Sequence, residues 1–120
     1  KYFKVAFDRI CMHECVFSAS QQAERGVHAI DIAKYLIDQG VHPPTVYFPL
    51  TVKESIMIEP TETESKSTMD RFIDLMIKAD ELSQTNPEMF HDLPKNMPIS
   101  RPDEVKAAMD IDTNYFMKQS

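Results

Sequence analysis

Residues 55–83, SIMIEPTETESKSTMDRFIDLMIKADELS, contain the clearest secondary-structure signals of the chain. Hydrophobic side chains in the second half recur at steps of three and four residues, which is the pattern of an amphipathic helix running to about Ser83. Thr61 and Glu64 form a capping-box pattern, so we expect the helix to follow them directly. The helical stripe consists of Met69, Phe72, Ile73, Met76 and Ile77.

Three segments have the β-branched and aromatic composition of strands. These predicted strands are residues 10–17, 45–48 and 55–58. Between the first two, hydrophobic residues at helical spacing predict a helix over Ala29–Asp38, with Gly40 at the position of a left-handed C-terminal cap. Asp31 is expected to stabilise the first turn of this helix, and Asp38 to face solvent.

The order strand, helix, strand, strand, helix predicts an α/β (α+β) fold with a small, open, mostly antiparallel sheet and helices on one face. The first two strands would run parallel, with the third antiparallel between them. Residues 1–85 would form this α/β core. Residues 86–120 are predicted to be a proline-rich extension with a short helix over 102–109, packed on the core or partly disordered, with fraying in the last ten residues.

The amino-acid composition excludes several classes of protein. The 120 residues are 42% hydrophobic and 27% charged, typical of one soluble globular domain, and no apolar run reaches the roughly 20 residues of a membrane span. Two glycines are too few for a P-loop or a dinucleotide-binding turn, and a net charge of −6 disfavours nucleic acid. The absence of an initiator Met suggests an internal piece of a longer protein, and two cysteines favour a reducing compartment, the cytoplasm.

Cys11, His13 and Cys15 are the only pattern in the sequence that suggests a metal site. On an extended strand the outer pair would lie about 13 Å apart, so three ligands cannot converge and we expect no metal site. The cysteines are predicted to be buried, structural and unbridged. His13 and Glu14 would point to opposite faces and could not serve one reaction centre, which makes His13 a structural residue.

Four motifs in this order and spacing resemble the C-terminal region of the glycine cleavage system P-protein, a glycine dehydrogenase (decarboxylating). They are Cys-Met-His-Glu at 11–14, Asp-Ile-Ala-Lys at 31–34, Gly-x-His-x-Pro-Thr at 40–45 and Ile-Glu-Pro-Thr-Glu-Thr-Glu at 58–64. The resemblance covers residues 9 to 78 and is closest to the subunit 2 form of the enzyme. Cys15 departs from the usual phenylalanine, and His28 stands where a threonine N-cap is expected, at a cost of up to about 1 kcal/mol.

The resemblance implies the small C-terminal domain of a pyridoxal-phosphate enzyme with the aspartate-aminotransferase type of fold. The full enzyme would be an oxidoreductase of amino-acid catabolism that decarboxylates glycine and passes the aminomethyl group to the lipoyl arm of the H-protein. Its partners would be the cofactor-binding large domain of the same chain, a second P-protein subunit and the H-protein. The family's cofactor lysine follows a histidine, and no His-Lys pair occurs here. The fragment alone is therefore expected to be inactive and to bind no cofactor.

No catalytic, cofactor-binding or metal-binding residue is assigned within this chain. The resemblance places the segment around His42 and Thr45 and the turn from Glu59 to Glu62 at strand ends near the substrate entrance. Side chains alternate between the two faces of the first predicted strand, and the face with Cys15 is expected to pack against the helices. Glu14 would then lie on the other face, which would point toward the large domain. The substrate-entrance candidates are His42, Thr45, Glu59, Glu14, Thr61 and Glu62. The alternative interpretation is a free-standing α/β ligand-binding or regulatory module.

Overall fold

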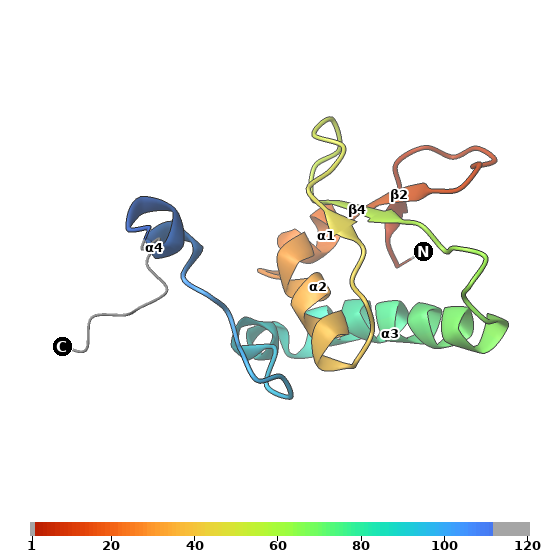
Figure 1. The fold of residues 1–120 in the computed structure, drawn as a ribbon. Coiled ribbons are helices and arrows are strands. Elements are labelled where there is room, and N and C mark those ends of the chain that lie inside the picture. The colour runs from red at the N-terminus through yellow and green to blue at the C-terminus, as the bar shows by residue number, and fades with distance from the viewer. Residues whose placement is uncertain (1, 112–120) are drawn as a thin grey trace.

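The computed structural model describes residues 2–111 of the chain, which form four short strands and several helices (Figure 1). In chain order the elements are β1 (Lys4–Val5), β2 (Cys15–Ser18), α1 (Ser20–Ala23), α2 (Ala29–Asp38), β3 (Thr45–Val46), β4 (Ser55–Ile58), α3 (Lys66–Thr85), the 3₁₀ helix η1 (Pro87–Asp92) and α4 (Glu104–Met109).

The four strands form one sheet in the order β1-β2-β4-β3, and every neighbouring pair is antiparallel. β2 and β3 therefore run parallel on either side of β4, with α2 in the connection between them. This arrangement confirms the predicted fold class and the predicted placement of the third strand. β1 was not predicted from the sequence, because two residues paired with the end of a neighbouring strand leave no periodic signal.

Two predicted strands are shorter than expected. β2 begins at Cys15, so the prediction of a strand from residue 10 is wrong for its first five residues. Cys15 pairs with Ile58, the last residue of β4, and Pro60 has no N–H with which to extend the ladder. Residues 10–14 consequently lack a partner strand. β3 ends at Val46 because Tyr47 has a positive φ of 60°.

The helix α2 has the predicted bounds, and Gly40 has a φ of +72°, as its left-handed cap position requires. The Asp31 carboxylate accepts a hydrogen bond of 2.8 Å from the His28 backbone N–H, which confirms its role in the first turn. The prediction that Asp38 faces solvent is wrong. Its carboxylate is buried and accepts the backbone N–H groups of Lys95 and Asn96 at 2.6 and 2.7 Å.

The long helix α3 confirms the strongest sequence prediction, although its start differs. The cap is Ser65, whose hydroxyl accepts the backbone N–H of Thr68 at 3.1 Å, instead of the expected capping box of Thr61 and Glu64. Those two residues form a turn, in which the Glu64 N–H donates to the Thr61 carbonyl at 3.1 Å. The helix thus starts one turn later than the pattern predicted.

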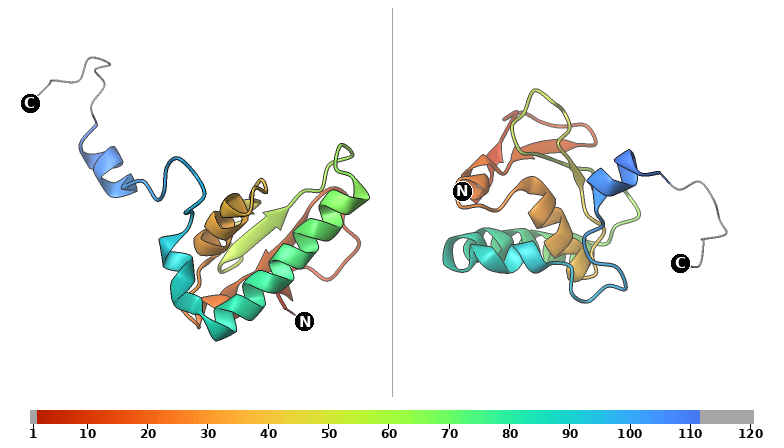
Figure 2. Two further views of the ribbon diagram at one scale, coloured as in Figure 1. Left: turned by 90° about the horizontal axis from the view of Figure 1, so that it is seen from below. Right: turned by 90° about the vertical axis from the view of Figure 1, so that its left-hand side faces the viewer.

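The hydrophobic core lies between one face of the sheet and the helices α2 and α3, which cover that face (Figure 2). Its largest fully buried side chains include Phe90, Ile32, Leu36 and Ile56. Phe90 comes from η1, so this part of the proline-rich segment packs into the core. The predicted short helix exists as α4, which has no buried residue and stands apart from the core (Figure 1). The predicted fraying concerns the last ten residues, of which 112–120 lie outside the described part of the chain.

Candidate functional site

The two faces of the sheet differ in what covers them. Cross-strand pairing places Phe17 and Ile56 on one face, where Ile56 belongs to the core beneath α2 and α3. This confirms that the Cys15 side of β2 faces the helices. The opposite face carries Val16 of β2, Met57 of β4 and Thr45 of β3, which are paired across the three strands. We call it the helix-free face.

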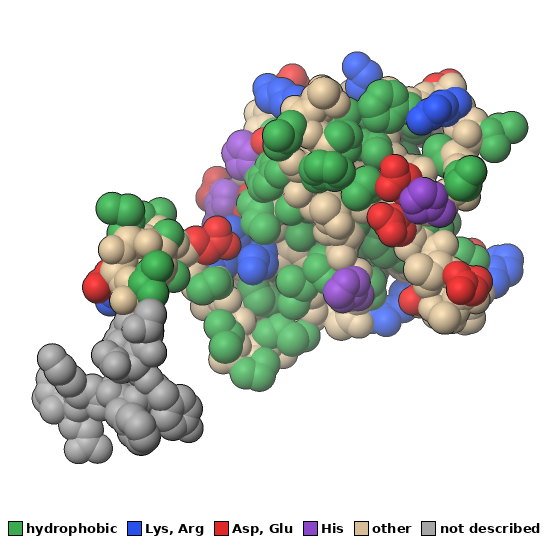
Figure 3. Space-filling model, turned by 45° about the horizontal axis from the view of Figure 1, so that its top comes forward, with side chains coloured by type: hydrophobic (Ala, Val, Ile, Leu, Met, Phe, Trp, Pro, Cys, Tyr) green, Lys and Arg blue, Asp and Glu red, His purple; other side chains and the backbone are tan. Residues whose placement is uncertain are grey.

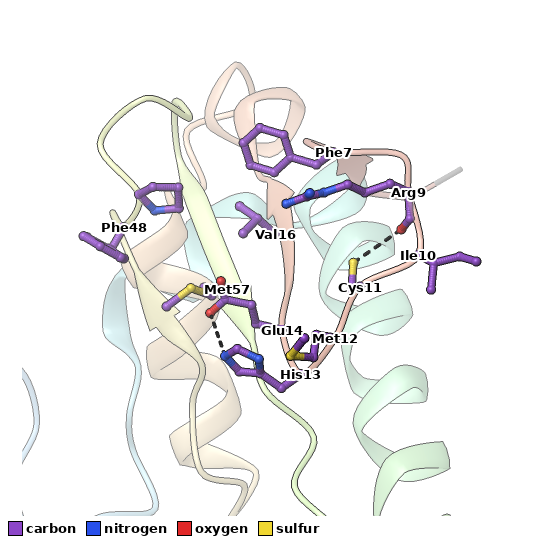
Figure 4. A pocket seen from close by; sticks show the side chains of 11 residues that line it. Phe7, Arg9, Ile10, Cys11, Met12, His13, Glu14, Val16, Phe48 and Met57 are labelled. Carbon is purple, nitrogen blue, oxygen red and sulfur yellow. Dashed lines mark hydrogen bonds and ion pairs between the residues drawn. The ribbon is translucent and has the colours of Figure 1, made fainter.

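A pocket of about 440 Å³ lies on the helix-free face (Figure 4). Val16 and Met57 form its floor, and two loops form its walls. Residues 6–14, which connect β1 to β2, form one wall and include Phe7, Arg9 and Glu14. Phe48 and Pro49 from the loop 47–54, which connects β3 to β4, form the other wall. The pocket thus combines hydrophobic walls with a few polar groups, as binding sites commonly do.

His13 and Glu14 approach each other at the rim of this pocket, with 3.8 Å between Nε2 and Oε2 (Figure 4). The prediction that they point to opposite faces is wrong because they belong to a loop and not to a strand. Their side chains are 68% and 43% exposed, so His13 is also not the buried structural residue that the sequence suggested. The two side chains place an imidazole and a carboxylate next to each other at the rim of the pocket.

Three of the candidate residues lie at the same end of the sheet. Glu14 precedes Cys15 and Glu59 follows Ile58, and these two strand residues are paired with each other. Thr45 pairs with Met57 on the helix-free face. Of the six candidates, Glu14 is the one that lines the pocket.

The other three candidates lie in exposed loops. His42 precedes β3, while Thr61 and Glu62 follow β4 in the turn that leads to α3. The Thr61 hydroxyl lies 2.8 Å from that of Thr63. The structure does not bring these three residues into the pocket.

Sequence reasoning missed the pocket walls and the residue that fixes one of them. Glu54, at the end of the loop 47–54, has a positive φ of 51° and a largely buried side chain. Its Oε2 accepts the Ala29 backbone N–H at 2.8 Å, and its Oε1 lies 3.0 Å from Nδ1 of His28. These contacts join residues 25 and 26 positions apart in the chain, and no local pattern signals them.

The two cysteines have different surroundings. Cys11 is exposed and its thiol donates to the Arg9 carbonyl at 3.4 Å, which corrects the prediction of a buried structural cysteine. Cys15 is half-buried, and burial raises the pKa of its thiol. Both thiols are free. Within residues 2–111, no three His, Cys, Asp or Glu side chains are grouped so that they could hold a metal ion.

Residues 1–99 match the family model described as the glycine dehydrogenase C-terminal domain. The chain belongs to this family. The match spans the whole sheet, α2, α3 and η1, and so includes every element that builds the pocket of this glycine dehydrogenase C-terminal domain. No helix of the described residues is long and apolar enough to cross a membrane.

Curated relatives of this glycine dehydrogenase C-terminal domain carry the name probable glycine dehydrogenase (decarboxylating) subunit 2. The protein of Treponema denticola is 56% identical over 116 residues, which are 96% of this chain and 24% of the relative. Those of Bacillus velezensis and Caldanaerobacter subterraneus subsp. tengcongensis are 53% and 50% identical, each over 89% of this chain and 22% of the relative. The chain therefore spans about a quarter of the length of these relatives.

Proposed function

We propose that this chain is the C-terminal domain of subunit 2 of a glycine dehydrogenase (decarboxylating). The complete enzyme would use pyridoxal phosphate to decarboxylate glycine and pass the aminomethyl group to the lipoyl arm of the H-protein. One observation carries the proposal. The family match extends over residues 1–99, and relatives bearing this name share more than half of their aligned residues with this chain.

The cofactor is proposed to lie outside this chain. Pyridoxal phosphate supplies an electron sink for carbanion chemistry and needs a lysine that forms a Schiff base with it. In the part of the chain that the structure describes, no lysine lines the pocket, and Arg9 is its one strongly basic side chain. These residues do not fit the cofactor, so the pocket is not proposed as its binding site.

The role proposed for this chain is to shape the substrate entrance beside the cofactor domain. Glu14, Thr45 and Glu59 lie at the same end of the sheet, where two carboxylates and a hydroxyl would orient a small polar substrate. His13 lies 3.8 Å from Glu14 and adds a second polar group at the pocket rim. His42 and the turn from Glu59 to Glu62 would add polar groups from the neighbouring loops.

The proposed partners follow from the same assignment. The relatives are named as subunit 2, so we propose a companion subunit for the complete enzyme, together with the H-protein and a cytoplasmic location. The acidic balance of the chain, with 19 carboxylate and 13 basic side chains, gives no reason to propose a nucleic acid or a membrane surface as a partner.

The test is to express the complete subunit that contains this chain together with its companion subunit. With pyridoxal phosphate and lipoylated H-protein, the mixture should release carbon dioxide from carboxyl-labelled glycine. A preparation without H-protein is the control for the transfer step. If the folded, cofactor-loaded complex released no label from glycine, the proposed function would be wrong.

A further inference from the structure

Exposed hydrophobic side chains are concentrated on the two loops that wall the pocket. Of the thirteen large hydrophobic residues exposed within residues 2–111, six belong to the loops 6–14 and 47–54. They are Phe7, Ile10, Met12, Tyr47, Phe48 and Leu50. Ile10, Met12 and Leu50 are 100%, 97% and 88% exposed. Four of the six, Phe7, Ile10, Met12 and Phe48, line the pocket. Scattered exposed hydrophobics are ordinary, but such a concentration around one pocket is typical of an interaction surface.

These side chains border the face of the sheet that no helix covers. Figure 3, with the top of the molecule turned toward the viewer, shows hydrophobic side chains gathered on this side, with acidic and histidine side chains beside them. The floor, Val16 and Met57, is hydrophobic as well. Arg9, His13 and Glu14 add polar groups around it. A hydrophobic centre with a polar border is the usual composition of a protein interface.

One wall of this surface is held in place before any partner binds. Glu54 attaches the loop 47–54 to α2 through the Ala29 N–H, and its own carbonyl accepts the Ala19 N–H at 2.8 Å. Phe48 and Leu50 are therefore presented on an anchored loop. A preorganised surface loses less conformational entropy on docking, which favours association.

We infer that the helix-free face, together with the loops 6–14 and 47–54, is the surface on which the preceding part of the same polypeptide docks. This inference rests on the proposed function, since it identifies the remainder of subunit 2 as the partner. The relatives are about four times as long as this chain, and the matched family is a C-terminal domain, so the remainder precedes it.

The position of the first strand supports an intramolecular partner. The loop 6–14 follows β1 directly, and β1 is the first element of the described residues. Gln22 holds the residues before β1 by donating from Nε2 to the Tyr2 carbonyl at 2.8 Å. A partner tethered beside its docking surface has a high effective concentration and needs no separate encounter.

Cys11 provides a probe within the surface, because it is an exposed thiol that lines the pocket. The reference is the variant Asp74→Cys, which introduces an exposed thiol on α3, outside the pocket and both loops. In the complete subunit, a maleimide should label Cys11 at least about tenfold more slowly than the reference thiol, because a covered thiol reacts only through local opening. In urea the two rates should be equal. Peptide mapping by mass spectrometry measures both, and equal rates in the native subunit would overturn the inference.

A pair of charge insertions tests whether the protection arises on this surface. Leu50→Asp in the complete subunit should speed the labelling of Cys11 by at least about fivefold, because an unpaired carboxylate cannot be buried at a hydrophobic contact. Val105→Asp is the control, since Val105 is also an exposed hydrophobic residue but lies on α4. If both variants left Cys11 fully protected, the surface would not be the docking site.

The same preparations separate this inference from the proposed function. Protection of Cys11 that appears only after the companion subunit is added would overturn the intramolecular partner. Normal glycine decarboxylation with an unprotected Cys11 would overturn the docking surface and leave the function intact. A protected Cys11 in a complex that cannot decarboxylate glycine would support the docking surface and refute the function.

Discussion

The Glu54 carboxylate caps α2 from outside the helix, because its Oε2 accepts the backbone N–H of Ala29 at 2.8 Å. His28, the residue at the N-cap position, directs its ring toward the same carboxylate. The cap that the sequence lacked is therefore supplied by a residue 25 positions away. This hydrogen bond connects α2 to the loop 47–54, which forms one wall of the pocket.

Glu54→Ala should lower the free energy of unfolding by about 1 to 2 kcal/mol, the usual cost of losing a helix cap together with a charge-assisted hydrogen bond. Urea unfolding followed by circular dichroism measures the change. Glu24→Ala removes an exposed carboxylate without a hydrogen-bond partner in the structure and should change stability by less than about 0.5 kcal/mol. Equal effects of the two variants would contradict the capping role.

Local signals predicted some elements closely, while contacts between distant segments decided the rest. The helix Ala29–Asp38 was predicted with the observed bounds, because its hydrophobic residues recur at helical spacing and Gly40 follows its end. The strand Ser55–Ile58 was also predicted correctly, because Pro60 marks where it stops. Residues 10–14 have strand composition, yet they form a loop because β4 offers no partner beyond Ile58.

For the candidate site, too, local signals predicted some features, while contacts between distant segments decided the others. The resemblance placed Glu59 at a strand end, and in the structure Glu59 directly follows Ile58, the last residue of β4. The sequence placed Glu14 within a strand, whereas in the structure it belongs to the loop before β2. The sequence could not predict the pocket, because the walls at Arg9 and Phe48 depend on how two loops fold over the sheet. Nor could it distinguish the Ser65 cap from the Thr61 pattern, since both combine a hydroxyl with acidic or polar residues at suitable spacing.

Asp80 links α1 and α3 through a buried polar cluster, and its removal should be costly. Its Oδ1 accepts Gln22 Nε2 at 2.5 Å and Arg25 at 3.0 Å, and its Oδ2 accepts Gln84 Nε2 at 2.9 Å. Asp80→Ala should destabilise the domain by about 3 to 5 kcal/mol, because it leaves the partly buried Arg25 without its carboxylate partner and with only the Ser83 hydroxyl, at 2.8 Å, as a hydrogen-bond acceptor.

The measurement is the unfolding free energy in urea, with Asp74→Ala as the matched control on the same helix. Asp74 is exposed, so its replacement should change stability by less than about 0.5 kcal/mol. A loss below about 1 kcal/mol for Asp80→Ala would show that the cluster contributes no net stability, as happens for some buried ion pairs.

Asp38 should make stability depend on pH in the acid range. Hydrogen bonds, first that from the Asn96 backbone N–H, hold the pKa of this carboxyl below its ordinary value of 3.8. A pKa that is lower in the folded state means that the stabilisation is complete above the ordinary value. It is lost as the pH falls from there through the lowered value.

Asp38→Asn removes the titrating group and should therefore flatten this part of the pH profile. The stability difference between the two proteins should be largest at about pH 6 and shrink toward about pH 2. Urea unfolding at a series of pH values measures it. A difference that stays constant over this range would show that the hydrogen bonds to residues 95 and 96 do not depend on the charge of Asp38.

His42 provides the most direct test of the proposed substrate entrance. The residue is exposed in the loop between α2 and β3, and in the residues described it makes no hydrogen bond that stabilises the fold. His42→Ala in the complete enzyme should lower kcat/KM for glycine decarboxylation by about tenfold, the effect of losing one positioning contact, while the melting temperature stays nearly constant.

His91→Ala is the matched control, because His91 is an exposed histidine on η1, outside the helix-free face. Full activity of the His42 variant, or a loss that follows unfolding, would exclude His42 from the entrance. An equal loss for His91→Ala would show that the assay responds to surface changes in general and would contradict the assignment as well.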